Sequence, residues 1–151
     1  MNVALLEVIL NIPCLILIAL IFASPFYINK KTSYLNFNRL VKITYLIMIN
    51  AIISGFLTFV YFYWSIELSN HILLEKMGYD TNGWNEYECL KNINPKNIEK
   101  AKEILFVQEG IGWPLKAIIN FIIIVLPYEI VISIILGIRS KTNIIFPKNI
   151  I

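Results

Sequence analysis

Charged residues are scarce in this chain, and their scarcity excludes most kinds of soluble protein. Only 15% of the 151 residues are Asp, Glu, Lys or Arg, against about 25% in ordinary soluble domains. A single domain of this length has a large water-facing surface, which so few charges cannot cover. Because 58% of the residues are hydrophobic, intrinsic disorder and a disulfide-dense secreted fold are excluded as well. The composition predicts a membrane protein.

Cysteine and histidine are equally scarce, which excludes several kinds of site. Cys14 lies in an apolar run and Cys89 in a polar stretch, so no internal disulfide is expected. Together with the single histidine, His71, they supply too few ligands for a metal. We expect a free Cys89 thiol, with a cross-link between two copies as the alternative. No catalytic triad, phosphate-binding loop or nucleic-acid-binding face is recognisable, so no catalytic residue, cofactor or nucleic-acid partner is expected.

Hydrophobic residues are gathered into three long runs, at residues 3–26, 43–66 and 115–138. About 20 helical residues cross the roughly 30 Å hydrocarbon core of a bilayer, so each run is long enough. Each is expected to be helical, because a lone strand in lipid leaves its backbone polar groups unpaired. The sequence therefore predicts an all-α integral membrane protein with three transmembrane helices. We expect it in a cell membrane, which is the inner membrane if the source is bacterial.

Lysine and arginine are unevenly distributed between the connecting segments, and this predicts the orientation. The connection at residues 27–42 carries four basic residues and no acid, and the tail at 139–151 carries three and no acid. The loop at residues 67–114 holds eight acidic residues against five lysines. The positive-inside rule then places the first connection and the tail in the cytoplasm. The N-terminus and the long loop are predicted to lie outside.

The extracytoplasmic loop at residues 67–114 is too long for a simple connector. Asn94 as an N-cap, Pro95 at the first helical position and Gly110 beyond the end predict a helix near residues 95–109. Its apolar residues follow helical spacing on one face. Such an amphipathic helix is predicted to lie on the outer membrane surface or to cover the mouth of the helix bundle, and docking of a partner is the alternative.

Polar residues inside the three runs are the hardest to explain, because polar groups are costly in lipid and usually face the protein interior. The intramembrane candidates are Glu7, Asn11, Asn50, Ser54, Lys116, Asn120 and Glu129. Depth along the helices is compatible with an ion pair between Glu7 and Lys116, with extension of the Glu7 side chain to the outer surface as the simpler alternative. It also places Asn50 or Ser54 beside Glu129. Hydrogen bonding between helices is the simpler explanation for most of these residues. For Glu129, close to Pro127, structural and functional roles are evenly balanced.

Two functions fit these residues. The first is a non-enzymatic membrane protein that binds a membrane or extracytoplasmic protein, as an accessory subunit or as an immunity-type protein against a membrane-active toxin. Trp84 and Tyr87 are the candidate partner-binding residues, because aromatic side chains often anchor interfaces. The alternative is an oligomeric channel or transporter subunit with a polar path around Glu129. An enzyme is the weakest possibility, because its acid–base candidates, Glu129 and His71, are predicted on opposite sides of the membrane.

Overall fold

The structure is a computed structural model that describes residues 2–33, 35, 37–108 and 111–139. Within these residues every regular element is a helix. Three helical segments of the described part are long and apolar enough to cross a membrane: Val3–Lys31, Arg39–Met77 and Trp113–Arg139. The chain is therefore an all-helical, multi-pass, membrane-associated protein, and the three membrane-length helices predicted from its hydrophobic runs are confirmed.

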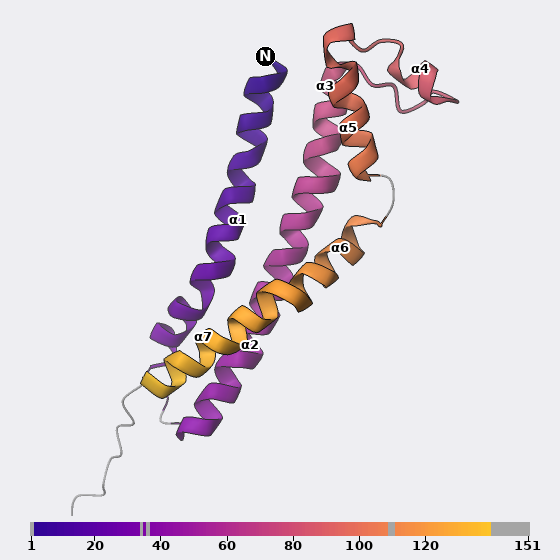
Figure 1. Ribbon diagram of the computed structural model, residues 1–151. Coiled ribbons are helices and arrows are strands. Elements are labelled where there is room, and N and C mark those ends of the chain that lie inside the picture. The colour runs from indigo at the N-terminus through magenta and orange to yellow at the C-terminus, as the bar shows by residue number, and fades with distance from the viewer. Residues whose placement is uncertain (1, 34, 36, 109–110, 140–151) are drawn as a thin grey trace, which may run out of the picture.

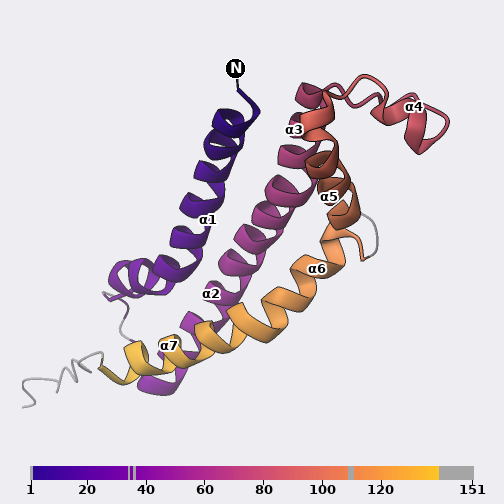
Figure 2. The ribbon, with the colours of Figure 1, turned by 45° about the horizontal axis from the view of Figure 1, so that its top comes forward.

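The first segment is the helix α1 (Val3–Lys31), which contains two prolines. Pro25 has no N–H, so the carbonyl of Ile21 loses its helical hydrogen bond. The hydroxyl of Ser24 donates to this carbonyl instead, at 2.9 Å. Figure 2 shows α1 bending near its end, as expected for a helix that contains a proline. Pro25 is buried at this bend, and Ser24 is half-buried.

The connection between α1 and α2 (Arg39–Phe62) is shorter than the loop predicted for residues 27–42. Both flanking helices continue into that range and leave residues 32–38 between them. Two lysines occupy the last turn of α1, where the helix dipole favours positive charge. The side chain of Asn38 accepts a hydrogen bond from a backbone N–H of the first turn of α2. Favourable helix ends thus extend both helices beyond the apolar runs. The predicted tail at 139–151 lies outside the described residues except for Arg139, which ends a helix.

The second segment joins α2, the π-helical η1 (Tyr63–Leu68) and α3 (Ser69–Met77) into one continuous rod of 39 residues. At about 1.5 Å per residue the rod is about 58 Å long, roughly twice the thickness of the hydrocarbon core. The rod ends at Gly78, whose φ of 95° is left-handed. A Cβ atom there would lie 2.7 Å from the Asn92 carbonyl oxygen, so the position requires glycine.

Residues 69–108 form a small folded unit, which we call the head. It contains α3, α4 (Glu86–Leu90), the 3-10 turn η2 (Pro95–Asn97) and α5 (Ile98–Gln108). In Figure 1, α5 runs back along α3 at the end of the molecule that also carries the N-terminus.

The head is held to α1 by an apolar core. The core consists of Leu6, Leu10, Leu73, Leu74, Met77, Ile93, Ala101 and Ile104. Because Ala101 and Ile104 come from the apolar face of α5, that face is buried inside the chain. Placement of this helix on a membrane surface stays a prediction, while its Ala101 and Ile104 side chains pack within the chain. Packing against α1 and α3 removes that apolar surface from water without a membrane.

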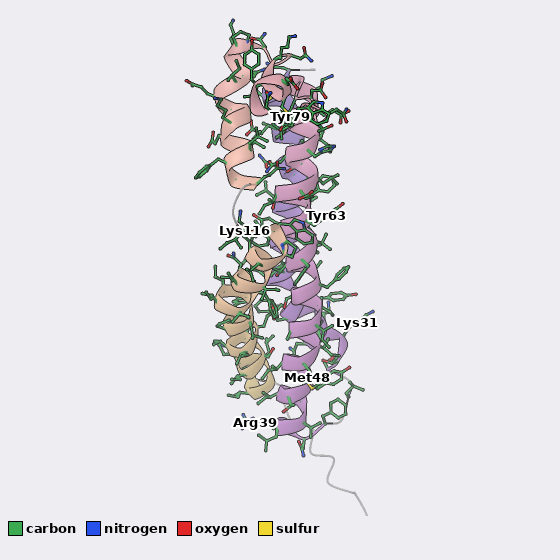
Figure 3. All side chains as sticks on the ribbon, turned by 90° about the vertical axis from the view of Figure 1, so that its right-hand side faces the viewer. Lys31, Arg39, Met48, Tyr63, Tyr79 and Lys116 are labelled. Atoms are coloured by element: carbon green, nitrogen blue, oxygen red, sulfur yellow. The ribbon has the colours of Figure 1, made fainter. Side chains whose placement is uncertain are left out.

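The third segment consists of α6 (Trp113–Asn120), the π-helical η3 (Phe121–Val125) and α7 (Leu126–Arg139). Pro127 cannot donate a backbone hydrogen bond and therefore interrupts the regular hydrogen bonding of the helix. The π-helical turn η3 lies directly before this interruption. Figures 1 and 2 show this segment crossing α2 at an angle. The Arg39 guanidinium donates to the Ile138 carbonyl at 3.0 Å, which ties the start of α2 to the end of α7. In Figure 3, Arg39 lies at the end opposite the head, and Lys116 lies close to the level of Tyr63.

Candidate functional site

Buried polar side chains gather where α1, α2 and α7 meet. On α2 they recur every four residues, at Asn50, Ser54 and Thr58, and on α7 they are Glu129 and Ser133. A spacing of four residues places each set on one face of its helix. All five side chains are at most 2% exposed. We call this group, together with Ser24 of α1, the polar cluster.

The hydrogen bonds of the polar cluster join two of its helices. The Asn50 side chain donates from Nδ2 to Ser133 Oγ at 2.9 Å, which links α2 to α7. The hydroxyls of Ser54 and Thr58 donate to the backbone carbonyls four residues earlier, each at 2.7 Å. These two side chains therefore direct their protons at their own helix. Their oxygen lone pairs still face the cluster as acceptors.

Glu129 is the most unusual member of the polar cluster. Its side chain is fully buried, and neither carboxyl oxygen accepts a hydrogen bond from a described protein group. The Oδ1 atom of Asn50 is also buried without a hydrogen bond. The hydroxyls of Ser24 and Ser54 lie beside the Glu129 carboxyl, and each is also within hydrogen-bond distance of a backbone carbonyl of its own helix. The polar cluster is thus rich in acceptors and poor in donors.

A carboxyl group in this environment is costly. A buried polar group without a partner costs about 1–3 kcal/mol, and more if it is charged.

The depth of the residues along the helices predicts Asn50 or Ser54 beside Glu129. In the structure Ser54 lies there, and Asn50 is bonded to Ser133, one turn farther along α7. Asn50, Ser54 and Glu129 are thus brought together. Ser24 is a member that the sequence interpretation missed; its position next to Pro25 inside an apolar run was the available signal.

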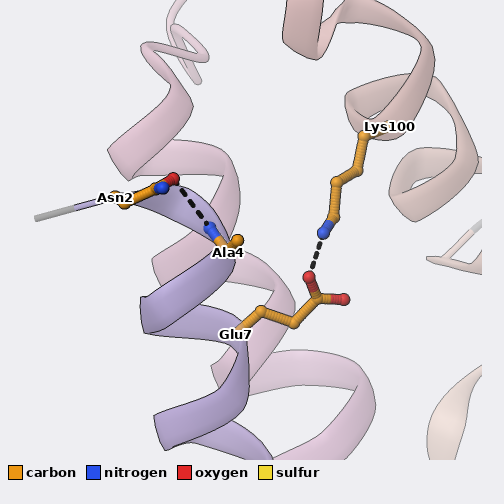
Figure 4. Close-up of polar contacts among 4 residues, drawn as sticks. All are labelled: Asn2, Ala4, Glu7 and Lys100. Atoms are coloured by element: carbon orange, nitrogen blue, oxygen red, sulfur yellow. Dashed lines mark hydrogen bonds and ion pairs between the residues drawn. The ribbon is translucent and has the colours of Figure 1, made fainter.

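The other intramembrane candidates lie outside the polar cluster. Figure 4 shows that Glu7 pairs with Lys100 of α5, so the predicted pair between Glu7 and Lys116 is wrong. Lys116 donates its ammonium group to the Val107 carbonyl at 2.8 Å instead. Depth within the three apolar runs does not include the head, which folds back and brings Lys100 to the start of α1.

The two remaining asparagine candidates make local contacts. Asn11 is exposed and lines a polar cleft that also includes Glu7 and Lys100. The Asn120 side chain donates to the Lys116 carbonyl at 3.0 Å, within its own helix. His71 is exposed on α3. None of these three residues reaches the polar cluster in the described structure.

The head presents the two aromatic candidates to solvent. Trp84 is 96% exposed and Tyr87 is 79% exposed. They lie in and next to α4, which Figure 1 shows projecting sideways from the end of the molecule that carries α3 and α5. Phe106 on α5 is a third exposed aromatic residue, which the sequence interpretation missed. It lines a shallow hollow together with Trp84.

The segment that carries Trp84 is fixed by local hydrogen bonds. The Trp84 N–H donates to the Glu88 carboxylate at 2.9 Å, and the Glu88 N–H donates to the Asn85 side chain at 2.9 Å. This arrangement closely resembles a capping box at the start of α4. A Cβ atom at Gly83 would lie 2.7 Å from Cys89 Sγ, so the chain passes too closely there for a side chain. The exposed tryptophan is therefore held on an ordered turn.

A groove of about 840 Å³ lies next to Tyr87. Its lining is mostly apolar, with lysines along it. The lining residues are Asn85, Tyr87, Leu90, Lys91, Ile93, Pro95, Ile98 and Lys102. An apolar floor with basic groups beside it suits an apolar side chain flanked by a carboxylate.

The fold and these two regions define the class: a small multi-pass helical membrane protein with a buried polar cluster and a folded head. Cys14 and Cys89 are free thiols, and both are buried. Among the described residues, no three His, Cys, Asp or Glu side chains are grouped so that they could hold a metal ion. No protein-family model matches the chain, and no curated protein or solved structure matches it either.

Proposed function

We propose that this chain is a non-enzymatic membrane protein that binds a protein partner through its head, on the outer side of a cell membrane. The observation that carries the proposal is the 96% exposure of Trp84 on an ordered turn. Apolar surface left in water costs about 25 cal/mol per Å², which a binding partner would recover. Tryptophan and tyrosine are also the residues that most often anchor protein interfaces.

Two features favour a protein partner over the lipid surface. Ala101 and Ile104 of α5 are already buried against α1 and α3, so these side chains are not free to insert into lipid. Residues 67–114 carry eight acidic residues against five lysines, a balance that an anionic membrane surface would repel. The basic connection at residues 27–42 supports placement of the head outside, by the positive-inside rule.

The groove beside Tyr87 indicates the chemistry of the partner. Leu90, Ile93 and Pro95 offer an apolar floor, and Lys91 lies beside it. A complementary segment would insert an apolar side chain and place a carboxylate against the lysine. Such a segment could belong to a larger membrane complex, for which this chain is an accessory subunit, or to a membrane-active toxin, against which it confers immunity.

The test is site-specific photocrosslinking in native membranes. A photoreactive residue at position 84 should give one defined adduct, whereas the same residue at Tyr27 should not give it. Tyr27 is a matched control, because it is an aromatic residue that is 63% exposed and lies near the end of α1 that is remote from the head. The captured protein should then bind the purified chain directly, and Trp84→Ala should weaken that binding by about 30-fold, a loss of roughly 2 kcal/mol. Equal adducts at both positions, or unchanged affinity in Trp84→Ala, would contradict the proposal.

A second function is an oligomeric channel or transporter subunit with a polar path around Glu129. The specific observation in its favour is the fully buried Glu129 carboxyl without a hydrogen bond. Three helices enclose little space, so conduction would need several copies of the chain. Under this function Glu129→Gln changes ion flux in proteoliposomes and Trp84→Ala does not. No flux above that of empty liposomes would remove this candidate.

A further inference from the structure

No described cationic side chain reaches the polar cluster, and its buried acceptors outnumber the donors that reach them, which points to a ligand. Both carboxyl oxygens of Glu129 and Oδ1 of Asn50 are buried acceptors without a donor. The hydroxyls of Ser24 and Ser54 lie within hydrogen-bond distance of backbone carbonyls of their own helices, so these carbonyls compete with the Glu129 carboxyl for the two protons. Since nearly all buried polar groups in proteins are paired, three unpaired acceptors in one cluster require an explanation.

We propose that the polar cluster binds one small, hard monovalent cation, H⁺ or Na⁺, with Glu129 as its principal ligand. A proton would convert the carboxylate to a neutral acid whose O–H can donate to a neighbouring oxygen. A sodium ion would instead be held by the carboxylate together with carboxamide and hydroxyl oxygens, which are hard ligands. Either cation supplies the positive charge that the group lacks.

The cations of α1, α2 and α7 in the described part of the chain are poorly placed to supply this charge. On α2, Lys42 is eight residues from Asn50, which is about 12 Å along the helix. On α7, Arg139 is ten residues from Glu129, or about 15 Å. The basic residues of α1 nearest to Ser24 are in its last turn, beyond the bend.

Other titratable groups around the polar cluster are uncharged in their ordinary state. Tyr128 adjoins Glu129 on α7, and its hydroxyl donates to the Phe22 carbonyl of α1 at 2.7 Å. Cys14 on α1 and Tyr61 on α2 lie toward the head, ten and seven residues from Ser24 and Ser54. No charged side chain of α1, α2 or α7 in the described structure therefore adjoins the carboxyl along its helix.

This inference deepens the second candidate function, because a polar path requires a site where the ion rests. The inference also holds if the chain conducts no ions, since it concerns binding of a cation at Glu129 and not ion flux. A cation bound at Glu129 without flux in proteoliposomes would remove the path and leave the site. Partner capture at Trp84 tests neither of these.

The experiment uses the purified full chain in lipid nanodiscs. Infrared difference spectroscopy reports whether a protonated carboxylic acid is present near neutral pH, and thermal unfolding compares NaCl with choline chloride. Glu129→Gln is the test variant, because its amide has the same shape and supplies donors. Glu99→Gln, at an exposed acid of α5, is the matched control. Ser54→Ala keeps the carboxyl but removes one hydroxyl beside it.

The outcomes separate the two cations. For H⁺, an acid band present near neutral pH disappears in Glu129→Gln, stays in Glu99→Gln and does not respond to sodium. For Na⁺, the midpoint temperature of unfolding is higher in NaCl than in choline chloride, and Glu129→Gln abolishes this difference. Ser54→Ala weakens sodium binding about tenfold, as expected for the loss of roughly 1.4 kcal/mol. If the unaltered chain shows neither signal, or if Glu129→Gln retains it, the proposal is wrong. If Glu129→Gln does not fold, the response of the unaltered chain and of Ser54→Ala still decides it.

Discussion

Removing one side chain from the core of the head should release the head from α1 without unfolding the membrane-length helices. Ile104 is 8% exposed and packs in the cluster that joins α5 to α1 and α3. Substitution of a buried isoleucine by alanine costs about 2–5 kcal/mol, through lost transfer free energy and the cavity left behind. The Ile104→Ala variant should therefore increase opening of the head by about 30-fold or more, since each 1.4 kcal/mol is a factor of ten. Hydrogen exchange of the α3 and α5 backbone amides in nanodiscs measures this opening.

The control for this prediction is an isoleucine-to-alanine substitution at an exposed position outside the head. Ile123 is 67% exposed on the third membrane-length segment, so Ile123→Ala should change exchange in the head by less than about twofold. If Ile104→Ala left the exchange of α5 unchanged, the head would not be held by this core. Equal effects of both substitutions would refute the distinction between the buried face of α5 and the exposed surface of the bundle.

Three further predictions concern single contacts. A double-mutant cycle of Glu7→Gln and Lys100→Met should give less than about 1 kcal/mol of coupling in the same exchange assay, because both side chains are at least a third exposed. Added salt should reduce this coupling, and a larger coupling that does not respond to salt would contradict the prediction. Gly78→Ala should destabilise the end of α3 by at least about 1 kcal/mol, because the left-handed backbone and a nearby carbonyl leave no room for a Cβ atom, and unchanged exchange of α3 amides would refute it. Ser133→Ala should lower the free energy of unfolding in mixed micelles by about 1–3 kcal/mol, because it leaves the Asn50 amide without its acceptor; an unchanged value would show that the bond contributes nothing.

The membrane-length helices could be predicted because hydrophobic runs and helix length are local properties of the sequence. The polar residues of α2 and α7 were also recognisable, since a four-residue period is visible without any tertiary information. The contact of Glu7 with Lys100 was not, because these residues are far apart in sequence and meet through the fold of the head. The burial of the apolar face of α5 has the same origin. Amphipathic spacing shows that a face will be covered, but it does not show whether lipid, a partner or the chain itself covers it.

The continuous rod of α2, η1 and α3 has a mechanical consequence. Asn50 and the core residues Leu73 and Leu74 belong to one helical segment, so a rotation of the head is transmitted along this helix to the polar cluster. The π-helical turn η1 lies between the two regions and interrupts the regular helical hydrogen bonding of the rod. Thermodynamic reciprocity then applies: if a molecule seated on the head alters cation affinity by some factor, the cation alters the affinity of that molecule by the same factor. The two ends of this small chain would then act as one linked equilibrium.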